Sequence, residues 1–245
     1  MAQTKDEIDK ITDEAVKEAS DRFNDYLEII LLLAVSDRSR SEKVKMITTQ
    51  LERILRWNAD FAERILSRTY RRESAEAYKA VKAEVTELSS SQQKELENLV
   101  AQLNEDLDSA AQLYAKKGRK LALLRELKKI REDKLNYEDG TVKQTTSNNS
   151  TVLRDKLEFT DSKGRMIRSD LLMSLVVGDT VWMTSNGAKA STWIALGFYF
   201  GIHRSVMDDV TTEICRSLNG KKRDLRSDKL PPMHHKCRSK IEVII

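Results

Sequence analysis

The side chains that could bind a soft metal ion gather near one end of this 245-residue chain. Both cysteines and all three histidines fall between residues 203 and 237: His203, Cys215, His234, His235 and Cys237. Thiolate sulfur and imidazole nitrogen are donors that zinc prefers, and the spacing of His234 and Cys237 suits two ligands of one ion. We therefore expect Cys215, His234 and Cys237 to be able to hold a structural zinc ion. His203, His235, Asp208 or a water molecule would supply the fourth ligand.

Other interpretations of these residues stay open. The two thiols could pack as small buried hydrophobic side chains, or join in a disulfide where the surroundings are oxidising. A thiol hydrolase would use Cys215 as nucleophile, His234 as base and Asp208 to orient that base. No nucleophile elbow, phosphate loop or dinucleotide fingerprint accompanies them. We therefore expect a structural protein and not an enzyme.

Two short blocks of sequence surround these candidates. Residues 208–220 read DDVTTEICRSLNG, and residues 231–239 read PPMHHKCRS. Together they resemble the phage Mu F-like head morphogenesis family of minor head proteins, whose pattern runs Asp-x-x-Thr, Cys-x-x-Leu-Asn/Asp-Gly and Pro-Pro-x-His-x-x-Cys-Arg-Cys/Ser. Beyond the metal-ligand candidates, the matching residues are Asp208, Thr211, Leu218, Asn219, Gly220, Pro231, Pro232, Arg238 and Ser239. Many relatives carry a second cysteine directly after the Thr, where this chain has Thr212.

The resemblance implies a virion protein that acts structurally in head morphogenesis. Its expected place is the head interior or the portal vertex, after synthesis in the host cytoplasm. Its expected partners are the portal protein or the major capsid protein, and packaged double-stranded DNA with which it could be ejected. No membrane and no small-molecule substrate are expected. The alternative is a zinc-stabilised nucleic-acid-binding module that works outside the virion.

Several matched residues have structural interpretations of their own. Asn219 and Gly220 suit a tight turn with positive φ. Pro231 and Pro232 would stiffen the chain before the last strand. Arg238 could join two loops through the carboxylate of Asp208, or Asp208 could cap a short helix that starts near Thr211.

The first part of the chain is predicted to be helical. Residues 1–117 contain neither glycine nor proline, the two residues that cost most inside a helix. Capping-box patterns begin at Thr4, Ser39 and Ser90. Apolar residues three or four apart form two stripes that we expect to be core. The first stripe comprises Ile47, Leu51, Ile54, Leu55, Phe61, Ala62, Ile65 and Leu66, and the second Leu96, Leu99, Val100, Leu103, Leu107, Ala110, Ala111 and Tyr114.

Charge is distributed unevenly along the chain. Residues 1–115 carry 17 basic and 23 acidic side chains, whereas residues 116–245 carry 26 and 16. Clustered basic side chains are what DNA phosphates require, although a solvated helix face is the commoner explanation. The residues that could contact DNA are Lys116, Lys117, Arg119, Lys120, Arg125, Lys128, Lys129 and Arg131.

These patterns predict an α+β fold in three parts. Residues 1–138 form an extended helical region, a bundle or a long hairpin that is basic at 116–131. Residues 139–152 form a polar linker, and residues 153–245 a small mixed α/β module. Within that module we expect a hairpin around residues 162–164, a helix from Ser169 or Asp170 through Trp182, and strands within 197–206 and 241–245.

Overall fold

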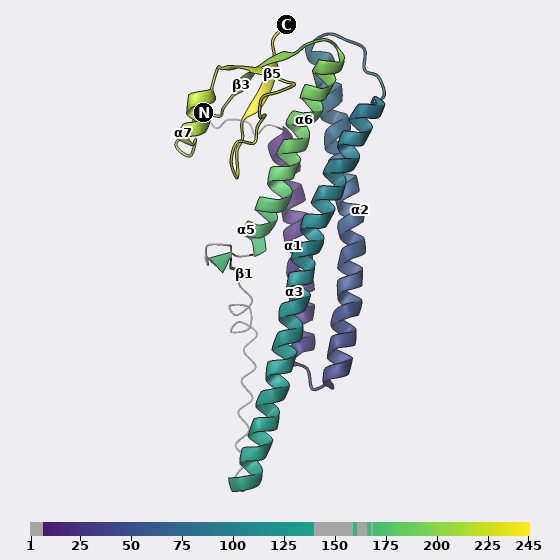
Figure 1. The fold of residues 1–245 in the computed structure, drawn as a ribbon, viewed down its shortest axis with the longest axis vertical. Helices are drawn as coiled ribbons and strands as arrows, with labels where there is room; N and C mark the ends of the chain where they lie inside the picture. The colour runs from purple at the N-terminus through teal and green to yellow at the C-terminus, as the bar shows by residue number, and fades with distance from the viewer. Residues whose placement is uncertain (1–6, 140–158, 161–165, 168) are drawn as a thin grey trace. The chain divides into compact units, whose positions relative to one another are not determined.

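The computed structural model describes residues 7–139, 159–160, 166–167 and 169–245, and the side chains of residues 7–124 and 171–245. The helical elements are α1 Glu7–Val35, α2 Arg40–Ala80, α3 Ser90–Asp139, α5 Ser169–Met173, the π-helical segment η1 Ser174–Gly178, α6 Asp179–Ala195 and α7 Glu213–Leu218 (Figure 1). The strands are β1 Phe159–Thr160, β2 Met166–Ile167, β3 Phe200–Arg204, β4 Lys222–Asp224 and β5 Lys240–Val243. The predicted α+β class, with a long helical region followed by a small mixed module, is confirmed.

The long helices occupy the segment without glycine or proline, and α3 continues beyond it. Gly118 lies inside α3, where a Cβ atom would come within 2.2 Å of the Ile30 side chain on α1. Only a glycine permits so close an approach, so this residue packs two helices together and does not end one. Among the described helices, none is both long enough and apolar enough to cross a membrane.

Two of the three predicted capping boxes fall on described residues. The box at Ser39 is confirmed, because the Ser39 N–H donates to Glu42 Oε2 at 3.0 Å and the Glu42 N–H donates to Ser39 Oγ at 3.4 Å. The box predicted at Ser90 lies one residue earlier, where Ser89 N–H donates to Gln92 Oε1 at 3.0 Å and Gln92 N–H to Ser89 Oγ at 3.3 Å. The box at Thr4 lies outside the described residues.

The chain divides into two compact units, and neither is one continuous segment. Unit 1 combines residues 1–19, 59–106 and 170–245, and unit 2 combines residues 20–58 and 107–169. The predicted linker at 139–152 lies outside the described residues except for Asp139, the last residue of α3.

Unit 2 has an aromatic core. The rings of Phe23 and Tyr26 on α1 and Tyr114 on α3 contact one another with centroids 6.0 to 6.5 Å apart. Burial raises the pKa of Tyr26 and of Tyr114 well above the ordinary value. At the end of this core, Asn58 on α2 donates to Asp108 on α3 at 2.7 Å.

In unit 1, α6 makes polar contacts with α2 and α3. Glu73 on α2 is buried and accepts from Ser185 at 3.0 Å and from Lys189 at 2.7 Å. On α3, Glu95 accepts from Tyr70 at 2.7 Å and from Ser191 at 2.5 Å. Because buried polar groups are costly when unpaired, these contacts fix which face of α6 meets α2 and α3.

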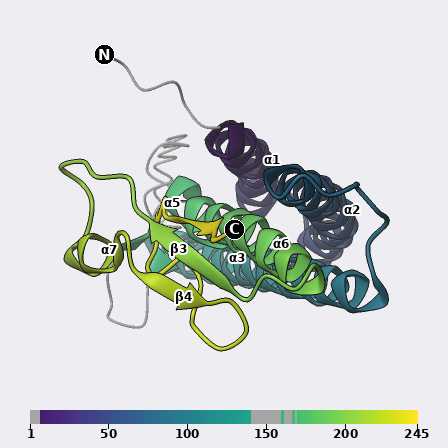
Figure 2. The same cartoon turned by 90° about the horizontal axis from the view of Figure 1, so that it is seen from above.

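A three-stranded antiparallel sheet covers the end of α6 in unit 1. The strand order is β4-β3-β5, with β3 in the centre, and Figure 2 shows β3 beside β4 with α7 beyond. Its apolar side meets a cluster formed by Ala77, Ala190, Trp193, Leu225 and Ile241. The indole of Trp193 donates to the backbone oxygen of Ala77 at 3.0 Å. Ile241 of β5 belongs to the same cluster, so apolar packing joins the sheet to α6 and α2.

The predicted C-terminal elements are present with adjusted bounds. The two strands of the predicted hairpin pair as Phe159 with Ile167, although its turn lies outside the described residues. The helix predicted from Ser169 runs on through α5, η1 and α6, passing both Gly178 and Gly187. The predicted strand within 197–206 is β3. The last strand, β5, begins one residue before the predicted start and ends two residues before the predicted end, at Val243. Strand β4 was not predicted.

Candidate metal centre

The short helix α7 and the loop before β5 position the three expected metal ligands. Cys215 lies in the first turn of α7, whose N-cap is Thr212. The Thr212 side chain accepts from the Cys215 backbone N–H, which anchors that turn. His234 and Cys237 stand on the loop 231–239, where the Cys237 N–H donates to the His234 carbonyl at 3.1 Å. Both elements belong to unit 1.

The three side chains meet. Cys215 Sγ lies 3.1 Å from His234 Nε2 and 3.5 Å from Cys237 Sγ. All three donor atoms lie within 4.8 Å of one another. In a tetrahedral zinc site two sulfurs stand about 3.8 Å apart, and a sulfur and a nitrogen about 3.5 Å apart. Outward shifts of a few tenths of an ångström would admit the ion, so the group is compatible with zinc binding.

The imidazole of His234 is oriented as a ligand. Its Nδ1 lies 2.7 Å from the His235 carbonyl oxygen. Because a carbonyl oxygen only accepts, Nδ1 carries the proton, and the lone pair is left on Nε2, which faces Cys215. Such a hydrogen bond from the outer nitrogen is the usual support of a metal-binding histidine.

The surroundings of Cys237 favour the thiolate form of its side chain. Burial raises the pKa of its thiol, but hydrogen bonds from the Ser239 hydroxyl, from the backbone of Met233 and Ser239 and from Cys215 outweigh that effect. The net result is a pKa below the ordinary thiol value. Because the thiolate is the form that binds metal, these donors favour coordination. Both thiols are free in this structure.

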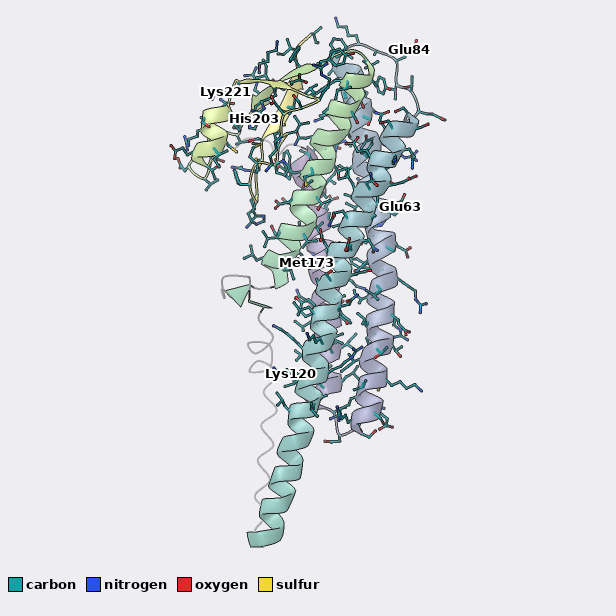
Figure 3. The ribbon with its side chains drawn as sticks, in the orientation of Figure 1. Glu63, Glu84, Lys120, Met173, His203 and Lys221 are labelled. Carbon is teal, nitrogen blue, oxygen red and sulfur yellow. The ribbon has the colours of Figure 1, made fainter. Side chains whose placement is uncertain are left out.

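His203 and His235, two of the proposed fourth ligands, do not belong to the group within the described residues. His203 lies on β3, where Figure 3 labels it, and is fully buried. It pairs with Ile241 on β5, and neither of its ring nitrogens has a described hydrogen-bond partner. Burial, and then the charge of Arg223, lower the pKa of His203. His235 instead donates from Nδ1 to Asp179 Oδ2 at 2.9 Å.

Of the two roles predicted for Asp208, the structure shows the pairing with Arg238. Its carboxylate pairs with Arg238, as expected, and hydrogen-bonds the Thr211 hydroxyl at 2.7 Å. Hydrogen bonds from Arg238 and then Thr211 hold the pKa of Asp208 below the ordinary value. The cap of α7 is Thr212 and not Asp208, which corrects the other alternative. Asp208 is thus occupied and does not join the metal-ligand group.

The turn after α7 also follows the motif. Gly220 has a φ of +79°, whereas Asn219 has an ordinary φ of −58°. The Gly220 N–H donates to the His203 carbonyl at 2.8 Å, and Asn219 Oδ1 accepts from Ser205 N–H at 3.0 Å. The positive φ was expected at this turn, and a glycine adopts it without strain. Leu218 is half-buried beside it, and Pro231 is buried in the facing loop.

A cavity of about 800 Å³ adjoins the metal-ligand group within unit 1. Cys215 and His234 form part of its wall, and Thr212 lies beside them. The apolar part of the wall comprises Val16, Trp182, Val206 and Val210. Its charged part comprises Asp9, Asp13, Lys17, Asp179, Lys236 and Arg238.

The basic stretch of α3 is only partly a free surface. Lys116 and Lys120 are exposed, and Figure 3 labels Lys120. Lys117 is half-buried, and burial lowers its pKa. Arg119 turns toward α2 and donates to the Thr48 hydroxyl at 3.0 Å. The remaining basic residues, Arg125, Lys128, Lys129 and Arg131, lie on α3 with side chains outside the described residues.

Sequence reasoning missed Asp179. Its two carboxylate oxygens accept from His235 Nδ1 and from the Lys236 backbone N–H at 3.1 Å. This residue therefore holds the loop 231–239 against the start of α6. No local pattern marks Asp179, because the two segments are far apart in sequence.

Comparison with protein-family models, with curated proteins and with solved structures gave no match for this chain.

Proposed function

We propose that this protein is a minor head protein, a structural component of a phage head that takes part in head morphogenesis. It would contact the portal protein or the major capsid protein, in the head interior or at the portal vertex. The exposed lysines of α3 would lie along packaged DNA.

The observation that carries the proposal is the contact between the two sequence blocks that resemble one family pattern. Asp208 of the first block pairs with Arg238 of the second. Cys215 of the first block lies against His234 and Cys237 of the second. Residues that cooperate in one folded element explain why a pattern keeps both blocks at fixed spacing, so these contacts support the resemblance.

The ion of the Cys–His–Cys group would be zinc. Two thiolates and one imidazole suit zinc better than they suit calcium or magnesium, which prefer oxygen ligands. Binding would release the thiol protons and join α7 to the loop 231–239. In this proposal the ion's role is architectural, because it fixes the two blocks that carry the resemblance.

The contact of Cys215 with His234 also fits the first two members of a thiol-hydrolase site. The third member fails, because the carboxylate of Asp208 is held by Arg238 and Thr211, and His234 Nδ1 bonds a backbone oxygen. The structural proposal therefore accounts for more of the contacts.

The test is co-expression of the full chain with the portal and major capsid proteins of the phage that encodes it. Particles are then purified by sedimentation, and the zinc content of the purified chain is measured. We expect the chain to sediment with particles and to carry about one zinc per chain.

Cys215→Ser and Cys237→Ser should lose the zinc, whereas Ser217→Ala, an exposed position on the same helix, should keep it. A wild-type chain that never accompanies particles would refute the role in the head. A chain that accompanies particles without metal would refute only the zinc.

A further inference from the structure

The Cys–His–Cys group supplies three of the four ligands that zinc takes. Within the described part of the chain, no other Cys, His, Asp or Glu side chain joins it. The Asp208 carboxylate pairs with Arg238, and His235, whose Nδ1 donates to Asp179, does not lie with the three donor atoms. A zinc ion with three protein ligands keeps its fourth position for water or for a ligand from outside.

The cavity shows where that position faces. Cys215 and His234 belong to the cavity wall. Cys237 is 1% exposed and is not part of the wall. An ion held by these three residues would therefore adjoin the cavity on the side of Cys215 and His234, from which an outside ligand can approach it.

Charge and wall composition select the kind of ligand. Two thiolates and a neutral imidazole cancel the charge of Zn²⁺, so a neutral fourth donor leaves the site uncharged. An anionic donor would add a charge next to buried thiolates. The wall carries charged side chains of both signs, Asp9, Asp13 and Asp179 beside Lys17, Lys236 and Arg238, so it does not select an anion, and its apolar residues Trp182 and Val206 offer contacts to a ring.

We propose that this fourth position binds a small ligand through a neutral aromatic nitrogen, of which the imidazole ring is the simplest example. The inference rests on the zinc site of the proposed function. The ligand would replace a water, coordinate through its nitrogen lone pair and place its ring in the cavity. No covalent bond of the chain changes.

The test uses the full chain loaded with Co²⁺ and purified without imidazole. Co²⁺ absorbs visible light according to its donors, which d¹⁰ zinc does not. Imidazole and, in parallel, azide are titrated into the sample, and bound Co²⁺ is measured after gel filtration. We expect imidazole to shift the absorption bands saturably without removing Co²⁺, and azide to act only at higher concentration.

Thr212 offers a matched pair of variants. It lies on the cavity wall three residues before Cys215, the spacing of a Cys-x-x-Cys ligand pair. Thr212→Cys should supply a fourth thiolate and abolish the response to imidazole. Thr212→Ser keeps the capping hydroxyl and should retain the response.

Each of the remaining possible results would refute a different part of the inference. Failure to bind Co²⁺ refutes the zinc part of the proposed function and the inference with it. Co²⁺ that binds but ignores imidazole means that the protein fills the fourth position, which refutes the inference alone. A response to azide alone refutes the neutral donor, and a full imidazole response in Co²⁺-loaded Thr212→Cys refutes the position beside Thr212.

Discussion

At the scale of single residues, His203 is the buried group with the clearest consequence for stability. Its imidazole is fully buried without a described hydrogen-bond partner, and burial lowers its pKa. In the unfolded chain the same ring has an ordinary pKa of about 6.5. Below that pH the unfolded chain binds a proton that the folded chain refuses, so acid favours unfolding.

We therefore predict that His203→Leu reduces the pH dependence of stability. The free energy of unfolding of the wild type should fall relative to the variant by at most about 1.4 kcal/mol per pH unit as pH drops below about 6.5. Urea unfolding of both proteins at several pH values, in the same zinc buffer, measures the difference. Protonation of the metal ligands affects the wild type and the variant equally, so it cancels in the difference between their free energies of unfolding. A difference that does not change with pH would contradict the prediction.

At the scale of elements, the start of α3 allows a direct test of where a helix begins. Ser89 and Gln92 make the reciprocal bonds of a capping box, and the Gln92 amide also donates to Thr192 on α6 at 2.9 Å. Loss of a serine cap costs typically about 1 kcal/mol. Both Ser89 and Ser90 are exposed, so they differ mainly in this role.

We expect Ser89→Ala to lower the free energy of unfolding by about 1 kcal/mol. Ser90→Ala should change it by less than about 0.5 kcal/mol, as for an ordinary surface substitution. Chemical denaturation of the two variants beside the wild type is sufficient. If Ser90→Ala lowered the free energy of unfolding more than Ser89→Ala, the N-cap would be Ser90, as the sequence pattern indicated.

At the scale of the whole molecule, the predicted C-terminal module depends on the rest of unit 1. Its helix α6 obtains partners for buried polar groups from α2 and α3: Ser185 and Lys189 with Glu73, Ser191 with Glu95, Thr192 with Gln92, and Trp193 with Ala77. In a fragment of residues 153–245 these groups lose their partners on α2 and α3, and the apolar cluster around Trp193 is exposed to water.

We predict that this fragment lacks stable helix α6 when produced alone. Hydrogen exchange of residues 179–195 should be fast in the fragment and slow in the full chain. Equal protection in both would show that residues 153–245 fold without residues 59–106.

The sequence predicted most of what local patterns can encode. Apolar spacing identified the long helices, and the opposite charges of Asp208 and Arg238 identified their pair. Strand β4 was missed because Lys222–Asp224 is short and charged, without apolar alternation. The Asp179 contact with His235 was missed because it depends on how two distant segments pack, which no spacing records.

The arrangement of unit 1 has a consequence for how the protein is made. Its three segments, residues 1–19, 59–106 and 170–245, leave the ribosome in order, with unit 2 residues between them. Until α6 emerges, the carboxylates of Glu73 and Glu95 lack the side chains of Lys189 and Ser191 that they bind in the finished fold. Unit 1 therefore folds after most of the chain has been synthesised, and its completion awaits a segment far from its beginning.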